Sequence, residues 1–305
     1  MKLTCALILI TAFAAIAGNG TTGFTFLQVP AGARAVAMGG AFTAVPGDPL
    51  SLYWNPAAAS ASDRSMLSTT YTSYMMDMQA GFVGWVNPRE NSTIGVSLNY
   101  FYGGSFDRTT MEDPTGTGEQ FSSSSMALAG TWARPLTETI SVGATGRFIY
   151  SQIDTYNANG FSVDVGGIFT PASLRGFTAA LVVRNAGIQT KAFYNENDPM
   201  PTEISAGVSQ QLLQGNLLIA ADATMPFEGN FDAAVGAEYK PMEMLALRTG
   251  WSLKAMDTAD AAGGGFIDAM GFGMGTRYNQ FSLDYAWKPY ADLGNTHRIT
   301  LGIDI

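Results

Sequence analysis

A chain of 305 residues is long enough for one large domain or two small ones. Charged residues make up 13%, about half of the roughly 25% usual in soluble domains, and 47% of the chain is hydrophobic, which excludes a disordered chain. A net charge of -9 without a basic patch argues against nucleic-acid binding, and one histidine with one cysteine leaves no ligand set for zinc or an iron–sulfur cluster. We therefore expect no metal and no cofactor.

The first 17 residues have the pattern of a secretory signal peptide. Lys2 gives a positive start, the stretch from Leu3 to Ala17 is apolar, and small residues precede Gly18. Cys5 lies before most of the apolar run, which argues against a lipoprotein. We expect cleavage before Gly18 and export of the protein.

From about residue 65 the hydrophobic pattern has a period of two, which is typical of strands with one apolar and one polar or small face. Ile94, Val96, Leu98 and Tyr100, for example, alternate with smaller or polar residues. The pattern predicts fourteen strands over 65–73, 78–87, 93–102, 123–133, 139–151, 160–170, 176–185, 202–211, 215–224, 230–240, 244–253, 270–278, 280–288 and 296–305.

The connections between these strands alternate in length. Short ones follow the even strands, and longer ones mostly follow the odd strands, notably 103–122, 186–201 and 254–269. A transmembrane barrel has tight periplasmic turns and longer extracellular loops in this order. A water-soluble sandwich would also alternate. Strands of about ten residues and aromatic side chains near strand ends favour the membrane. The sequence therefore predicts an all-β, antiparallel, transmembrane barrel over residues 65–305.

The polar face of the strands also carries charges of both signs, which suits a wet or plugged lumen. The candidate lumen charges are Arg147, Asp164, Arg184, Glu203, Asp222, Asp232, Glu238, Arg248, Arg277, Asp284, Arg298 and Asp304.

Residues 18–64 follow a different pattern, dominated by alanine, glycine and short turns. Asp48 and Pro49 favour a helical turn over 51–54, which Asn55 and Pro56 would end. The segment is too small for a core of its own, so we expect it to form a hatch inside the barrel lumen, against a wall of glycines. We expect Arg34 to pair with a wall carboxylate or Asp48, or to donate to backbone carbonyls of the hatch. The alternative is that its long side chain reaches periplasmic water at the rim.

This segment carries a family resemblance. The run from Ala31 to Val45, together with Asp48 and the stretch from Leu52 to Ala57, resembles the N-terminal signature of the PorV/PorQ family, and the stretch from Asp292 to Ile299 resembles its last strand. That family is related to the FadL-type barrels, which share an Asn-Pro-Ala element in an N-terminal hatch. The residues that carry the resemblance are Arg34, Met38, Gly39, Gly40, Asp48, Trp54, Asn55, Pro56 and Ala57. Ile305 departs from the aromatic residue that usually ends such barrels.

The resemblance implies an outer-membrane protein of a Gram-negative-type bacterium. Members of the family work in type IX secretion, so the implied function is a scaffold or shuttle whose partners are outer-membrane lipids, secreted cargo domains and secretion-system components. The FadL relationship implies an alternative, a channel for long-chain fatty acids or other hydrophobic molecules. The residues show no catalytic arrangement, and we expect no enzyme and no nucleic-acid partner.

Overall fold

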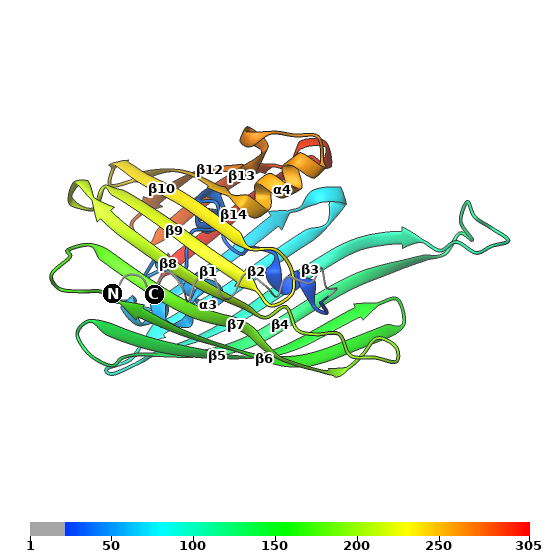
Figure 1. Ribbon diagram of the computed structural model, residues 1–305, viewed down its shortest axis with the longest axis horizontal. Coiled ribbons are helices and arrows are strands. Elements are labelled where there is room, and N and C mark those ends of the chain that lie inside the picture. Colours follow the sequence, from blue (N-terminus) through cyan, green and yellow to red (C-terminus); the bar gives the residue numbers. More distant parts are fainter. Residues whose placement is uncertain (1–21) are drawn as a thin grey trace, which may run out of the picture.

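The computed structural model describes residues 22–305, and the predicted signal peptide lies outside this range. Fourteen antiparallel strands form a closed barrel in which each strand pairs with its neighbours in sequence and β1 pairs with β14 (Figure 1). The predicted barrel of fourteen strands is therefore confirmed. The strands are β1 Met66–Ser73, β2 Gln79–Pro88, β3 Thr93–Asp107, β4 Gln120–Pro135, β5 Ile140–Ile153, β6 Tyr156–Phe169, β7 Phe177–Lys191, β8 Glu203–Leu212, β9 Leu217–Pro226, β10 Asp232–Met242, β11 Leu245–Ser252, β12 Met270–Tyr278, β13 Phe281–Pro289 and β14 Asn295–Asp304.

The helices are short. They are α2 Ala33–Ala37, α3 Ser51–Trp54 and α4 Leu253–Ala261, with 3-10 turns η1 Thr25–Gln28, η2 Pro56–Ala61, η3 Met75–Asp77, η4 Leu213–Gly215, η5 Phe266–Ala269 and η6 Ala291–Leu293. Among residues 22–305, none of the helices has the length and apolar character needed to cross a membrane.

The predicted connections after the odd strands differ from the structure. Strands β3 and β4 continue as a ribbon beyond the barrel, β7 continues to Lys191, and only residues 154–155 join β5 to β6. The stretch from 253 to 269 contains α4 and η5 rather than an irregular loop. In the ribbon, Ser105, Phe106 and Asp107 are all exposed, so both faces meet solvent and the alternation that reveals a strand is lost.

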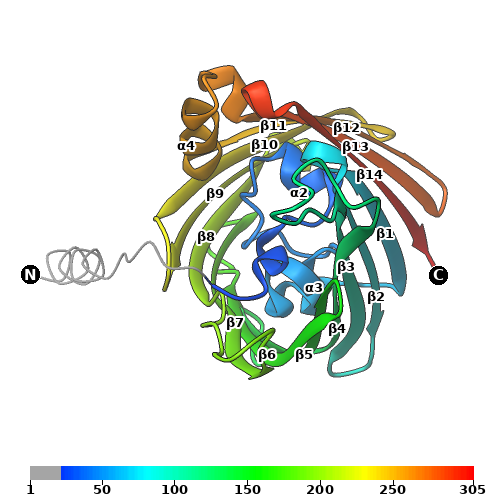
Figure 2. The ribbon, with the colours of Figure 1, turned by 90° about the vertical axis from the view of Figure 1, so that its right-hand side faces the viewer.

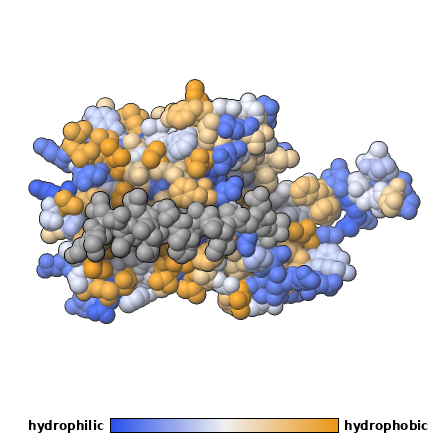
Figure 3. Space-filling view, in the orientation of Figure 1, coloured by the Kyte–Doolittle hydropathy of each residue, from blue (hydrophilic) through white to orange (hydrophobic). Residues whose placement is uncertain are grey.

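The two faces of the wall meet different surroundings. In mid-strand the outward side chains are apolar and exposed, as for Val96, Leu98 and Val165, while the inward Ser97 and Thr145 are buried. On the visible part of the outer face, hydrophobic side chains form several large patches, and hydrophilic ones are concentrated at the two ends (Figure 3). This arrangement matches the apolar band of a transmembrane barrel.

The two ends of the barrel are distinct. The connections after the even strands form one end, called the turn end here, where β14 finishes beside the start of β1. The connections after the odd strands form the opposite end, the loop end, which carries the β3–β4 ribbon and α4 (Figure 1). The hatch, residues 22–64 of the described chain, fills the lumen between them, as the view from the loop end shows (Figure 2).

Candidate functional site

The hatch turns sharply after α2, because its path must follow the inside of the wall. Gly39 and Gly40 end the helix with φ of 69° and 90°, a left-handed conformation that glycine adopts at little cost. A Cβ on Gly39 would come within 2.6 Å of the backbone nitrogen of Trp251 on β11. Both its dihedral angles and its contact with the wall therefore require glycine at this position.

The strands that contact α2 have glycines at the points of contact, so no side chain separates the helix from the wall. A Cβ on Gly250 or Gly236 would collide with the backbone of Met38, and a Cβ on Gly271 would collide with the carbonyl oxygen of Val36. Met38 itself is fully buried. The expected glycine wall is therefore present, and it brings the helix backbone into direct contact with the strands.

A second group of glycines receives the Asn-Pro-Ala element on the opposite wall. A Cβ on Gly143 of β5 would come within 2.5 Å of the Ala57 nitrogen, and a Cβ on Gly166 of β6 would collide with the side-chain oxygen of Asn55. The hatch thus spans the lumen from β11–β12 to β5–β6 and rests on glycine at both sides.

Asn55 joins two parts of the hatch. Its side-chain oxygen accepts from the Ala57 backbone N–H at 3.0 Å and so caps η2, while its Nδ2 donates to the Thr43 carbonyl oxygen at 3.0 Å. Its backbone is extended and Pro56 opens η2, so α3 ends here. The side chain is fully buried, and both of its polar atoms have the partners that burial requires.

Arg34 of α2 contacts Asp48 and one of the wall carboxylates, Glu238. Its Nε lies 2.7 Å from Glu238 Oε2 on β10, its Nη2 donates to Glu238 Oε1 at 2.8 Å, and its Nη1 lies 2.9 Å from Asp48 Oδ2. Burial lowers the pKa of Arg34, but the charges of Glu238 and Asp48 outweigh it, so the pKa lies above its ordinary value. This guanidinium remains charged and ties the hatch to the wall.

The ion pairs continue along the wall. Arg248 of β11 lies 2.6 Å from Glu238 Oε2 and 2.6 Å from Asp284 Oδ1 on β13. Glu238 is 2% exposed and therefore depends on its two arginines for stabilisation. We call Arg34, Asp48, Glu238, Arg248 and Asp284 the latch network.

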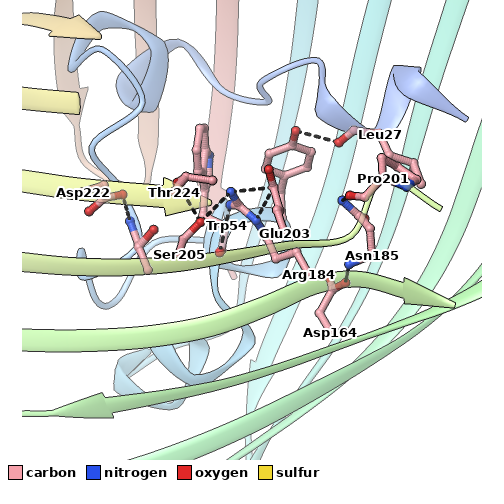
Figure 4. A network of polar contacts seen from close by, with 12 residues as sticks. Leu27, Trp54, Asp164, Arg184, Asn185, Pro201, Glu203, Ser205, Asp222 and Thr224 are labelled. Carbon is pink, nitrogen blue, oxygen red and sulfur yellow. Dashed lines mark hydrogen bonds and ion pairs between the residues drawn. The ribbon is translucent and has the colours of Figure 1, made fainter. Parts of the chain in front are cut away.

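Arg184 anchors the other side of the hatch, near α3 (Figure 4). Its guanidinium lies 2.8 Å from Glu203 Oε1, donates to the Trp54 carbonyl oxygen at 3.2 Å and to Ser205 Oγ at 3.3 Å, and lies over the Trp54 ring. Trp54 Nε1 in turn donates to the Ala31 carbonyl oxygen at 3.1 Å. Arg184 therefore binds the end of α3. The indole of Trp54 connects α3 to the segment before α2.

Asp222 of β9 receives the hatch backbone between these two anchors. Its Oδ2 accepts from the backbone N–H groups of Phe42 and Thr43, each at 2.8 Å, and the residue is 8% exposed. Two backbone donors that would otherwise be buried without partners are thereby satisfied.

Arg147, Asp164 and Asn185 form a buried cluster where β6 and β7 fall out of register. Asn185 occupies a bulge with φ of 56° and donates its backbone N–H to Asp164 at 2.7 Å, and Arg147 pairs with Asp164 at 2.7 Å. Pairing between β7 and β8 begins at Arg184 and Glu203, so β7 beyond the bulge has no β8 partner. The cluster therefore satisfies the backbone where the wall changes pairing.

The remaining candidate charges lie nearer the ends of the lumen. Arg277 has a side chain that is 56% exposed and lies 3.6 Å from Asp304 at the turn end. Asp232 accepts from the Lys254 backbone N–H at 2.8 Å at the loop end, and Arg298 is fully buried on β14. The twelve charges therefore form several separate groups rather than one site.

Sequence reasoning missed several residues that hold the hatch. Thr300 Oγ1 accepts from the Ala33 backbone N–H at 2.9 Å, Ser209 Oγ donates to the Ala44 carbonyl oxygen at 2.7 Å, and the Tyr53 hydroxyl lies 2.9 Å from the Leu27 carbonyl oxygen. Burial raises the pKa of Tyr53, which keeps this hydroxyl protonated as a donor. The inward position of Thr300 and Ser209 follows from the strand alternation, whereas Tyr53 lies in α3 of the hatch. No pattern in the sequence singles the three out from other hydroxyl residues.

Two cavities lie on opposite sides of the hatch. The turn-end cavity, about 370 Å³, is lined by Arg34, Asp48 and Glu238, and the loop-end cavity, about 350 Å³, is lined by Tyr53, Trp54 and Lys288 among others. The two cavities have no lining residue in common. Within residues 22–305 no group of histidine, cysteine and carboxylate side chains gathers as metal ligands.

The fold resembles solved outer-membrane transporters. The toluene transporter TodX of Pseudomonas putida superposes with a TM-score of 0.62 at 12% identity over 90% of this chain and 96% of its own. The toluene transporter TbuX of Ralstonia pickettii gives 0.60 at 12% identity over 90% and 97%, and a Pseudomonas aeruginosa FadL homologue gives 0.56 at 13% over 95% and 100%. At such identities the likeness is one of fold, that of an outer-membrane barrel.

Comparison with curated proteins gives no match. The family model described as type IX secretion system protein PorV matches residues 16–193, more than half of the chain. The match contains the whole described hatch and the strands from β1 to β7. The chain therefore belongs to the PorV family of outer-membrane barrels.

Proposed function

We propose that this barrel is a non-enzymatic scaffold, or shuttle, for proteins that a type IX-like system secretes and attaches to the cell surface. The match to the PorV model carries the proposal. The closed hatch supports it, because a scaffold needs a stable surface rather than an open passage, and ion pairs and backbone hydrogen bonds fasten this hatch to the wall.

The β3–β4 ribbon is the part of the barrel best placed to contact a protein partner. It extends beyond the wall at the loop end (Figure 1), and Met111 at its tip is 98% exposed. Its base is stiffened by the Arg108–Asp154 ion pair at 2.8 Å and by contact between the Phe106 and Phe121 rings, whose centroids lie 5.5 Å apart. A stiff projecting ribbon offers a defined docking arm at little cost in ordering entropy.

Shortening the ribbon tests the scaffold role. Residues 109–118 are replaced by a two-residue Asn-Gly turn, and cargo proteins at the cell surface are measured by surface proteolysis in the bacterium that makes the chain. We expect surface cargo to fall while the barrel still folds, as a heat-modifiability gel reports. Normal surface cargo after complete removal of the gene would contradict the scaffold role itself.

A second candidate function is a channel for hydrophobic small molecules. It is favoured by the shared fold with two toluene transporters and by the pair of cavities that the hatch separates. Uptake of labelled oleate and toluene is measured in a host that lacks its own transporters for them. Uptake above the empty-vector level would favour the channel, and its absence together with cargo loss would favour the scaffold.

A further inference from the structure

The loop-end cavity is bordered by a buried lysine, with a buried arginine close behind it. Lys288 near the end of β13 is 7% exposed and lines the cavity, and Arg298 of β14 is fully buried close by. The two are connected through Thr296, whose hydroxyl donates to the Lys288 carbonyl oxygen at 3.3 Å and lies 2.9 Å from Arg298 Nη1.

The two cations have aromatic neighbours instead of carboxylates. The Lys288 ammonium lies 5.4 Å from the centre of the Tyr290 ring, and the Arg298 guanidinium lies 5.8 Å from the centre of the Tyr74 ring. Arg298 Nε and Nη2 have no hydrogen-bond partner. Within residues 22–305, neither Lys288 nor Arg298 has a carboxylate oxygen within the 4.0 Å of an ion pair.

Three acids also line this cavity, and each has a partner other than Lys288. Glu203 pairs with Arg184, Asp222 accepts from the hatch backbone, and Asp232 accepts from the Lys254 backbone N–H. A buried cation without a partner is costly in free energy, and a ring face returns only part of that cost. Asp222 and Asp232 keep their negative charge, because a backbone N–H does not neutralise a carboxylate. Neither forms an ion pair with Lys288 in the described chain, so the Lys288 ammonium borders the cavity without a direct carboxylate partner.

Tyr290, which follows β13, is also affected by the positive charges of Lys288 and Arg298. Burial raises the pKa of its phenol, but the charges of Lys288 and Arg298 outweigh that effect, and the pKa lies below its ordinary value. Tyr290 lines the cavity beside Lys288.

We propose that the loop-end cavity is an oxyanion-binding site, in which the Lys288 ammonium receives a phosphate or carboxylate group and the unpartnered Arg298 strengthens its attraction. Lys288 contacts the anion directly. Arg298 lies behind the tyrosines and acts through its field. The site has room for a phosphate group, since the cavity measures about 350 Å³. The proposal does not depend on the scaffold role, because it concerns the charge of a cavity and not what docks on the outside.

Titration calorimetry on the purified full-length barrel in detergent tests the site. The probes are inorganic phosphate and acetate, which separate the two chemistries, in a buffer without other oxyanions and at low ionic strength. We expect at least one probe to bind the wild type, and Lys288→Met to weaken that binding about tenfold, the effect of one hydrogen bond to a charged group. Lys288→Arg should retain most of the affinity.

The control is Lys191→Met, which removes a lysine from the same end of the barrel but outside the cavity, and it should leave the affinity unchanged. Lys288→Gln replaces Lys288→Met if the latter does not fold. The proposal is overturned if neither probe binds the wild type. It is also overturned if Lys288→Met, or Lys288→Gln in its place, binds the probe as tightly as the wild type does.

Discussion

Gly166 of β6 lies directly against the side-chain oxygen of Asn55, so that the wall has no room for a single additional methyl group at this point. The same oxygen caps η2 by accepting from the Ala57 backbone N–H at 3.0 Å. A glycine on the wall and an amide on the hatch therefore form one structural unit. Its neighbour Gly167 differs, because the nearest atom to a Cβ there, the Ser141 carbonyl oxygen, is 3.8 Å away.

This difference predicts unequal effects of two adjacent substitutions. Gly166→Ala should destabilise the barrel by about 1–3 kcal/mol, the usual cost of overpacking, and should loosen the Asn-Pro-Ala element. Gly167→Ala serves as the matched control and should change little. Heat-modifiability gels give the stability, and limited proteolysis of the folded barrel gives the exposure of the hatch. Equal stability of the two variants would contradict the contact.

Asn55 allows a test of hydrogen bonding without a change of shape. Asn55→Asp keeps the acceptor for the Ala57 N–H but loses the Nδ2 donor to Thr43 and places a charge where exposure is 0%. We expect a loss of several kcal/mol for the charge, because no cation donates to this side chain. Asn55→Ala should cost about 1–3 kcal/mol, since it leaves two buried backbone groups without partners. Chemical unfolding in detergent measures both, and a milder effect of Asp than of Ala would refute the assigned donor.

Strand alternation made most of the barrel predictable. Where one face meets lipid and the other meets the hatch, as around Leu98 and Ser97, the period of two is clear, and all fourteen strands were found. Where both faces are wet, as in the ribbon beyond Tyr102, the pattern disappears and the prediction ended too early. The polar face of the strands is buried inside the barrel rather than exposed to solvent, as Ser97 shows with an exposure of only 5%.

The candidate site was predictable in kind but not in its pairings. A lone arginine in an apolar hatch requires a carboxylate, so a partner for Arg34 could be expected, yet several inward acids were equivalent until the register fixed Glu238 beside it. The bulge at Asn185 gave no signal, because a one-residue register shift leaves the local composition unchanged.

On the outward face, the cost of introducing a charge should depend on its depth in the bilayer. Leu98 lies in mid-strand and is 39% exposed, whereas Leu212 is 41% exposed at the turn end of β8. Leu98→Arg should cost about 2–4 kcal/mol and Leu212→Arg about 0–1 kcal/mol, because a charge is tolerated near the interface but not at the bilayer midplane. Folding into lipid vesicles, followed by unfolding in urea, measures both. Equal costs at the two depths would place the membrane elsewhere on the barrel.

The latch network predicts that two substitutions are less harmful together than one alone. Arg34→Met leaves Asp48 without its cation and leaves Glu238 and Asp284 to share Arg248, with Lys240 as a half-exposed cation 3.7 Å from Glu238. Unpaired buried carboxylates are costly, so we expect a loss of about 3–5 kcal/mol and a hatch that proteases reach.

Adding Glu238→Gln to Arg34→Met removes one negative charge and so restores the wild-type net charge of the network, while keeping the volume of the Glu238 side chain. The Arg248–Asp284 pair at 2.6 Å remains and is neutral by itself. The double variant should therefore regain at least about 1 kcal/mol over Arg34→Met, a coupling of the size that residues in one network give. Planar-bilayer conductance is the second measurement, since a released hatch should open a passage between the two cavities. Additive losses in stability, or a pore that stays shut in Arg34→Met with the hatch still protected from protease, would show that Arg34 does not hold the hatch.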